Sequence, residues 1–116
     1  MDFDTSRITD AYMQEMLGKT KNYTLVLLKA GPAYADPGSR PIVMEHGRRN
    51  FAMRADGVLS IVCPIADDSE WCGIGIFDAP DDAVVAIMDA DPGVVAGVFT
   101  YETHPVRSFP GDALPG

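Results

Sequence analysis

The sequence predicts an α+β domain built on one antiparallel sheet. Apolar strand-like segments alternate with segments of helical periodicity, and the second and third strands are separated only by a short polar turn around Asp67 and Asp68, as in a hairpin. At 116 residues, 47% of them hydrophobic, the chain has room for one domain and one core.

Three helices are expected outside the strands. In the first, over residues 5–17, Thr5 or Ser6 can cap the start and Gly18 can end it. The second, over residues 41–55, has Pro41 in its first turn, where the missing N–H needs no partner. The third covers about residues 80–89, and Asp91 and Pro92 then open a short helical turn.

Four strands are expected, over residues 23–28, 58–65, 71–77 and 98–103. Without the first helix, the order is strand, helix, strand, strand, helix, strand. This order is typical of the ferredoxin-like fold, in which both helices cover one face of a four-stranded antiparallel sheet.

The alternation within the strands predicts a homodimer. Strand side chains point alternately to the two faces of a sheet, yet both sets in the first strand are largely apolar: Tyr23, Leu25 and Leu27 against Thr24, Val26 and Leu28. Two helices cover only one face, so a second copy packed on the other face is the simplest cover. The alternative is that the N-terminal helix and the C-terminal tail cover it within one chain.

Charge and composition exclude some partners and places. The formal net charge is −8, which disfavours nucleic acid and anionic membrane surfaces. Arg48, Arg49 and Arg54 crowd one stretch and form either a solvated helix face or a site for an anionic small molecule. The acidic start lacks the basic and apolar regions of an export signal, and no segment approaches the ~20 apolar residues of a membrane span. With only two cysteines, we expect a cytoplasmic protein.

The stretch MDADPGVVAGVFTYETHPVRSF, with HGRRNFAMRADGVLSIVCPI upstream, resembles the YCII-related (YciI-like) domain family. The resemblance lies in His46 early in a helix, in Gly57 before an apolar strand, and in the D-P-x-V-x-A-G-V run that begins at Asp91. It covers roughly residues 22–108, which leaves residues 1–21 as a helical extension and residues 109–116 as an extended tail. It implies the dimeric α+β-barrel variant of the ferredoxin-like fold. One branch of the family is similar to a dehydrochlorinase thought to use a His–Asp pair, and the matching residues here are His46 and Asp91.

The residues themselves support the same chemistry. Imidazole gains and loses protons near neutral pH, and a carboxylate on one ring nitrogen would orient the ring and stabilise its charged form. The alternatives are a half-exposed histidine at a helix boundary, and an aspartate that only caps the turn before Pro92. Capping and ring orientation are compatible, because a carboxylate has two oxygens. Arg49 or Asn50, next to His46, could hold an anionic or polar substrate.

Two functions therefore remain open from the sequence. The first is an uncharacterised lyase- or isomerase-type enzyme that uses His46 and Asp91 for acid–base chemistry on a small molecule. The second is a non-catalytic, dimeric ligand-binding or accessory module, which needs only a cleft. No cofactor motif is found, and no metal is expected because His46 and His104 lie outside any cluster of ligands.

Cys63 and Cys72 would lie opposite each other if the hairpin turn is centred between Asp67 and Asp68. They are then either a redox pair or two reduced core cysteines.

Overall fold

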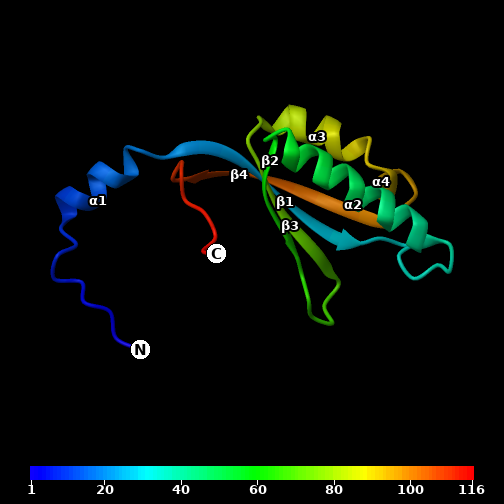
Figure 1. Ribbon diagram of the computed structural model, residues 1–116, viewed down its shortest axis with the longest axis horizontal. Coiled ribbons are helices and arrows are strands. Elements are labelled where there is room, and N and C mark those ends of the chain that lie inside the picture. Colours follow the sequence, from blue (N-terminus) through cyan, green and yellow to red (C-terminus); the bar gives the residue numbers. More distant parts are fainter.

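A four-stranded antiparallel sheet with helices packed on one face makes up the body of the protein (Figure 1). The computed structural model describes every residue from Met1 to Gly116. The elements are α1 (Asp10–Leu17), β1 (Lys21–Ala30), α2 (Ser39–Ala55), β2 (Leu59–Pro64), β3 (Trp71–Phe77), α3 (Asp81–Asp89), α4 (Pro92–Val95) and β4 (Phe99–Ser108). The predicted α+β class is therefore confirmed. None of the helices combines the length and the apolar character needed to cross a bilayer.

The strands are ordered β2-β3-β1-β4, so β1 and β3 are central and β2 and β4 form the edges. The core lies between this sheet and helices α2, α3 and α4. Its buried apolar side chains are Val26, Leu28, Leu59, Phe77, Val84, Met88, Val98 and Phe99. The core therefore contains residues from all four strands, from α3 and from the residue just before β4.

Several element boundaries differ from the sequence prediction, and two of the differences have clear local reasons. Helix α1 begins at Asp10, not at residue 5, because the Thr9 side chain accepts a hydrogen bond from the Tyr12 N–H and caps the helix there. Strand β4 continues to Ser108, through Pro105, although the prediction ended it at residue 103. Because β4 is an edge strand, a proline without an N–H is tolerated in it.

The second face of the sheet has no helix over it (Figure 1). Thr24, Val26 and Leu28 are buried beneath the helices, whereas the alternating Tyr23, Leu25 and Leu27 remain partly exposed on the other side. Helix α1 buries no residue and extends away from the sheet, so the alternative in which it covers this face is wrong.

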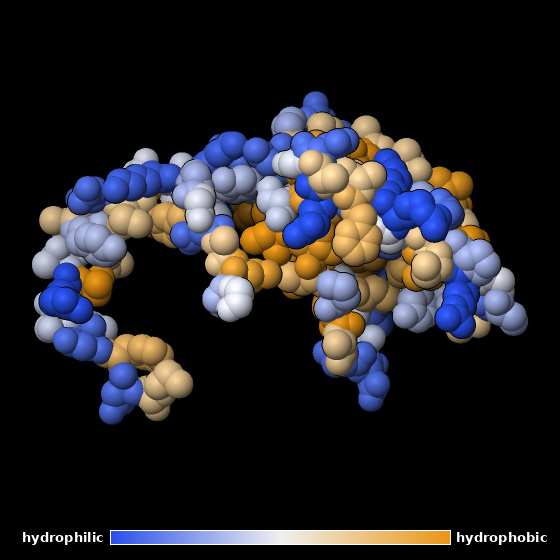
Figure 2. Space-filling model, in the orientation of Figure 1, coloured by the Kyte–Doolittle hydropathy of each residue, from blue (hydrophilic) through white to orange (hydrophobic).

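The C-terminal tail covers only one end of this face. Residues 109 and 111–114 line a shallow hollow together with Tyr23, Ile61 and Ile76. Hydrophobic residues also gather in the central hollow between the N-terminal arm and the β2–β3 hairpin (Figure 2). The sheet therefore keeps an apolar surface that one chain does not cover.

Cys63 and Cys72 are free and do not oppose each other. Cys63 pairs with Ile74, while the Cys72 carbonyl accepts the N–H of Ile65. These pairs place the centre of the hairpin turn between Asp68 and Ser69, one residue later than the predicted centre between Asp67 and Asp68. When the centre of a turn moves by one residue, each residue of one strand faces a partner two positions further along the other strand. The predicted opposition of the two cysteines is therefore wrong.

Tyr101 is expected to ionise at a higher pH than an ordinary tyrosine. Its hydroxyl donates to Asp89 Oδ1 at 2.7 Å, and burial together with this bond and the Asp89 charge raises the pKa of Tyr101 to about 12. The neutral phenol therefore stabilises the fold at pH below about 10, and this contribution is lost as the pH rises towards 12. Absorbance at the phenolate band should show one late titration that moves to lower pH in Asp89→Asn; coincident titration of all tyrosines would contradict the assignment.

Candidate active site

His46 is the one buried residue of helix α2. The rest of this 17-residue helix is partly or fully exposed, and its apolar side chains Ile42, Val43 and Met53 pack against the core on either side of His46 along the chain. An imidazole thus occupies the position at which the helix is closest to the interior. The alternative of a half-exposed boundary histidine is wrong, since only 8% of His46 is accessible.

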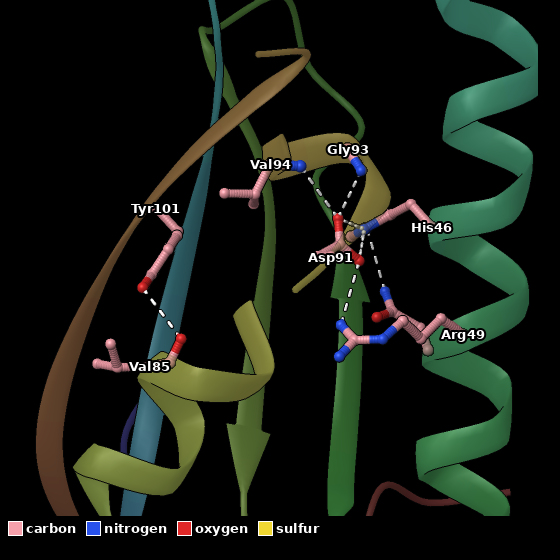
Figure 3. A network of polar contacts seen from close by, with 8 residues as sticks. His46, Arg49, Val85, Asp91, Gly93, Val94 and Tyr101 are labelled. Atoms are coloured by element: carbon pink, nitrogen blue, oxygen red, sulfur yellow. Dashed lines mark hydrogen bonds and ion pairs between the residues drawn. The ribbon is translucent and has the colours of Figure 1, made fainter. Parts of the chain in front are cut away.

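Asp91 meets His46 from the start of helix α4 (Figure 3). The Nδ1 atom of His46 lies 2.9 Å from both Oδ1 and Oδ2 of Asp91. Oδ2 also accepts the backbone N–H groups of Gly93, at 2.9 Å, and Val94, at 3.3 Å. The carboxylate therefore caps the short helix and contacts the ring at once, which is the double role that its two oxygens allow.

The environment keeps Asp91 ionised. Burial by itself raises the pKa of a carboxyl group, and Asp91 is only 1% accessible. The hydrogen bond and charge of His46 and the two backbone N–H groups outweigh burial, so the pKa of Asp91 lies below its ordinary value. The pair at neutral pH is thus a carboxylate facing Nδ1 of an imidazole.

Asn50 contacts the His46 imidazole at the nitrogen that does not face Asp91. Its Nδ2 lies 3.2 Å from His46 Nε2, one helical turn further along α2. With the Nδ1 proton donated to Asp91, the neutral ring carries a lone pair on Nε2, which accepts from the Asn50 amide. The basic atom of the pair is therefore Nε2.

A cavity of about 380 Å³ includes both His46 and Asn50 in its wall. It lies between α2 and the sheet, and the β2–β3 hairpin contributes Asp67 and Ser69 to it. Gly73 and Gly75 of β3 also line it. An added Cβ would lie 3.3 Å from the Cys63 carbonyl oxygen at Gly73 and 3.2 Å from Leu59 Cδ1 at Gly75. Neighbouring atoms therefore pack closely against both glycines, and a side chain at either position would crowd them.

Phe99 supports the imidazole from the core. The two ring centroids are 4.7 Å apart, with the planes tilted by 48°. Gly93 packs on the same phenyl ring so tightly that a Cβ there would lie 2.5 Å from Phe99 Cδ2. Asp91, Gly93 and Phe99 thus fix the ring through one continuous set of contacts.

The structure separates the two residues expected to bind substrate. Asn50 lines the cavity, whereas Arg49 does not. The guanidinium of Arg49 is directed at Asp91 instead, with Nη1 3.5 Å from Oδ1 (Figure 3). Arg48 is exposed and pairs with Glu45. The crowded arginines therefore do not form an anion site that faces the cavity.

Sequence reasoning missed the contribution of the β2–β3 hairpin to the cavity. Asp67 and Ser69 stand in a polar turn and give no local indication that they border a site. Gly73 and Gly75 stand two residues apart in the predicted strand over residues 71–77, and this spacing is the one available indication of a face without side chains.

Comparison with known proteins adds no assignment. No protein-family model matches the chain, and a search of curated proteins finds no significant match. The resemblance to the YCII-related family stays a prediction, and the geometry of the site carries the functional argument.

Proposed function

We propose that this chain is a small-molecule enzyme of the lyase or isomerase type, in which His46 is the general base and acid and Asp91 orients it. One observation carries the proposal: a buried aspartate holds Nδ1 of an imidazole at 2.9 Å, and the same imidazole lines a cavity of about 380 Å³. This arrangement of base and orienting group is the one that proton transfer requires.

The chemistry follows from the lone pair on Nε2, which becomes available to substrate when the Asn50 amide turns away from it. A C–H proton of the substrate moves to Nε2, and the electron pair of that bond forms a new C=C bond. In an elimination, the bond to a leaving group on the adjacent carbon breaks and the group departs with that electron pair. In an isomerisation, an adjacent double bond breaks instead, and its electron pair forms the bond to the proton that Nε2 returns at a different carbon. The Asp91 carboxylate stabilises the imidazolium formed in between. Since typical gains from a positioned acid or base are about 10²–10⁴-fold, the pair can supply a substantial share of the rate.

Covalent catalysis has less support. Cys63 and Cys72 both line the cavity, but burial raises the pKa of the Cys72 thiol, which opposes formation of the nucleophilic thiolate. No hydrogen bond joins either cysteine sulfur to His46, so neither thiol has a base that would activate it as a nucleophile.

We also propose that the fold is ferredoxin-like and that two copies pair through their uncovered sheet faces. The strand order β2-β3-β1-β4, with α2 and α3 on the same side, supports the fold assignment. The partly exposed Tyr23, Leu25 and Leu27 support the pairing. Sedimentation equilibrium at micromolar concentration should give about twice the chain mass of 12.5 kDa, and a strict monomer would rule the pairing out.

Two free thiols support a reducing, cytoplasmic location.

Deuterium exchange tests the catalytic proposal without a known substrate. We expect the protein to accelerate exchange of the α-protons of small uncharged ketones, such as cyclohexanone, in ²H₂O as followed by NMR. His46→Ala should reduce this acceleration by about 10²-fold, because it removes the base. His104→Ala is the matched control, since His104 is exposed on strand β4 and pairs with Glu102.

Equal exchange with wild type and His46→Ala would place the chemistry elsewhere. Binding of the ketones without any exchange would instead favour the non-catalytic ligand-binding module.

A further inference from the structure

The cavity wall contains neither lysine nor arginine. Most of its residues are hydrophobic, and its polar side chains include His46 and Asn50 on α2 and Asp67 and Ser69 on the hairpin. Arg49, three residues after His46, is engaged by Asp91 outside the wall. The cavity therefore offers no lysine or arginine to a negatively charged ligand, and a positive charge on His46 would already be paired with Asp91.

The one carboxylate in this wall is Asp67. Its Oδ1 accepts the backbone N–H of Ser69 at 2.9 Å and the Ser69 hydroxyl at 2.5 Å. These bonds hold the pKa of Asp67 below its ordinary value, so the side chain is charged at neutral pH. Because Asp67 is exposed in the turn while the strands beneath it are partly buried, its charge stands at the open side of the cavity.

An anion entering this cavity would lose hydration without gaining a lysine or arginine as counter-charge. Desolvation of an unpaired charge is costly, and the Asp67 carboxylate adds repulsion. An uncharged ligand has neither cost, and its apolar body would contact the hydrophobic wall. A hydrogen-bonding group on such a ligand would find the Asn50 amide, which has an oxygen and a second N–H besides the N–H directed at His46 Nε2.

We propose that the cavity selects uncharged, mainly apolar molecules with one polar group over anionic ones, and that Asp67 is the residue that discriminates between them. This inference rests on the proposed function, because it takes the cavity as the route by which substrate reaches His46. It also replaces the expectation, drawn from the crowded arginines, of an anionic substrate.

A pair of probes with one carbon skeleton and different charge tests the inference. Cyclohexylmethanol and cyclohexanecarboxylate are titrated separately into the ¹⁵N-labelled protein at neutral pH, and amide shifts are followed at Gly47, Gly73 and Gly75, which line the cavity. We expect the alcohol to shift these amides and to bind at least tenfold more tightly than the carboxylate.

Asp67→Asn should strengthen carboxylate binding by roughly fivefold and leave alcohol binding within twofold, as expected for removing one charge near a partly solvated site. Asparagine keeps an oxygen that can accept from Ser69, so the turn should persist. Asp68→Asn is the matched control, because it removes the same charge one residue away, from a side chain outside the cavity wall.

Carboxylate binding equal to or tighter than that of the alcohol would overturn the inference, as would an alcohol that leaves the cavity amides unshifted. Equal effects of Asp67→Asn and Asp68→Asn would overturn the role of Asp67. The readout is binding, so the result is separate from the exchange experiment. Lost charge discrimination with His46-dependent exchange intact contradicts only this inference, whereas discrimination without exchange contradicts only the proposed function.

Discussion

Replacing Asp91 with alanine is expected to lower the free energy of unfolding by about 3–5 kcal/mol, as measured by chemical denaturation. The substitution removes the acceptor of a buried imidazole, the cap of helix α4 and the carboxylate that faces Arg49 at 3.5 Å. The Arg49 Nη1 atom is buried and has no hydrogen bond, so it would lose its nearby counter-charge.

Asp91→Asn separates these contributions. Asparagine keeps an oxygen that can cap Gly93 and Val94 but loses the charge, so we expect a smaller loss of about 1–2 kcal/mol. Asp112→Ala, in the exposed tail, should change stability by less than about 0.5 kcal/mol. A cost below about 1 kcal/mol for Asp91→Ala would mean that the pair contributes little to the fold.

Replacing Gly93 with alanine is expected to destabilise the protein by about 2–3 kcal/mol through overpacking. The new Cβ would lie 2.5 Å from Phe99 Cδ2 and 3.0 Å from Asp91 Oδ2. Phe99 is 4% accessible and packs on the His46 ring, so relief of the clash would displace the imidazole as well. Thermal or chemical denaturation measures the loss, and the side-chain resonances of His46 should shift.

Gly47→Ala is the matched control for this substitution. Gly47 lies in helix α2, and an added Cβ there meets no atom within 4 Å. Alanine should therefore be neutral or stabilise the helix by up to about 1 kcal/mol. Similar destabilisation by the two substitutions would show that the contact between Gly93 and Phe99 is not the cause.

Local sequence patterns identify much of this site because its key contacts begin from local structure. An aspartate directly before a proline is a local signal for a helix N-cap, and Asp91 before Pro92 forms one. This cap places the Asp91 carboxylate at the start of α4, where it meets His46. His46 could be identified from the sequence as a candidate acid–base residue because imidazole gains and loses protons near neutral pH. Its burial, by contrast, depends on α2 packing against α4 and Phe99, which no segment of the sequence encodes alone.

The features that sequence reasoning missed depend on contacts between distant segments. Arg49 and Asn50 are neighbours on one helix, yet only the path of α4 directs Arg49 to Asp91 and leaves Asn50 at the cavity. Asp67 borders the cavity only because the hairpin extends beside α2. The register of that hairpin depends on where its turn is centred. Several consecutive polar residues are compatible with either of two centres one residue apart, so the sequence does not determine the register.

The protonation of the His46 ring tests the central claim most directly. Long-range ¹H–¹⁵N correlation spectra of ¹⁵N-histidine-labelled protein, recorded where His46 is neutral, distinguish the two tautomers. The geometry predicts a proton fixed on Nδ1, facing Asp91, and a bare Nε2 towards the cavity. In Asp91→Asn this preference should weaken. A proton on Nε2, or the rapidly exchanging mixture typical of a solvent-exposed imidazole, would contradict the account.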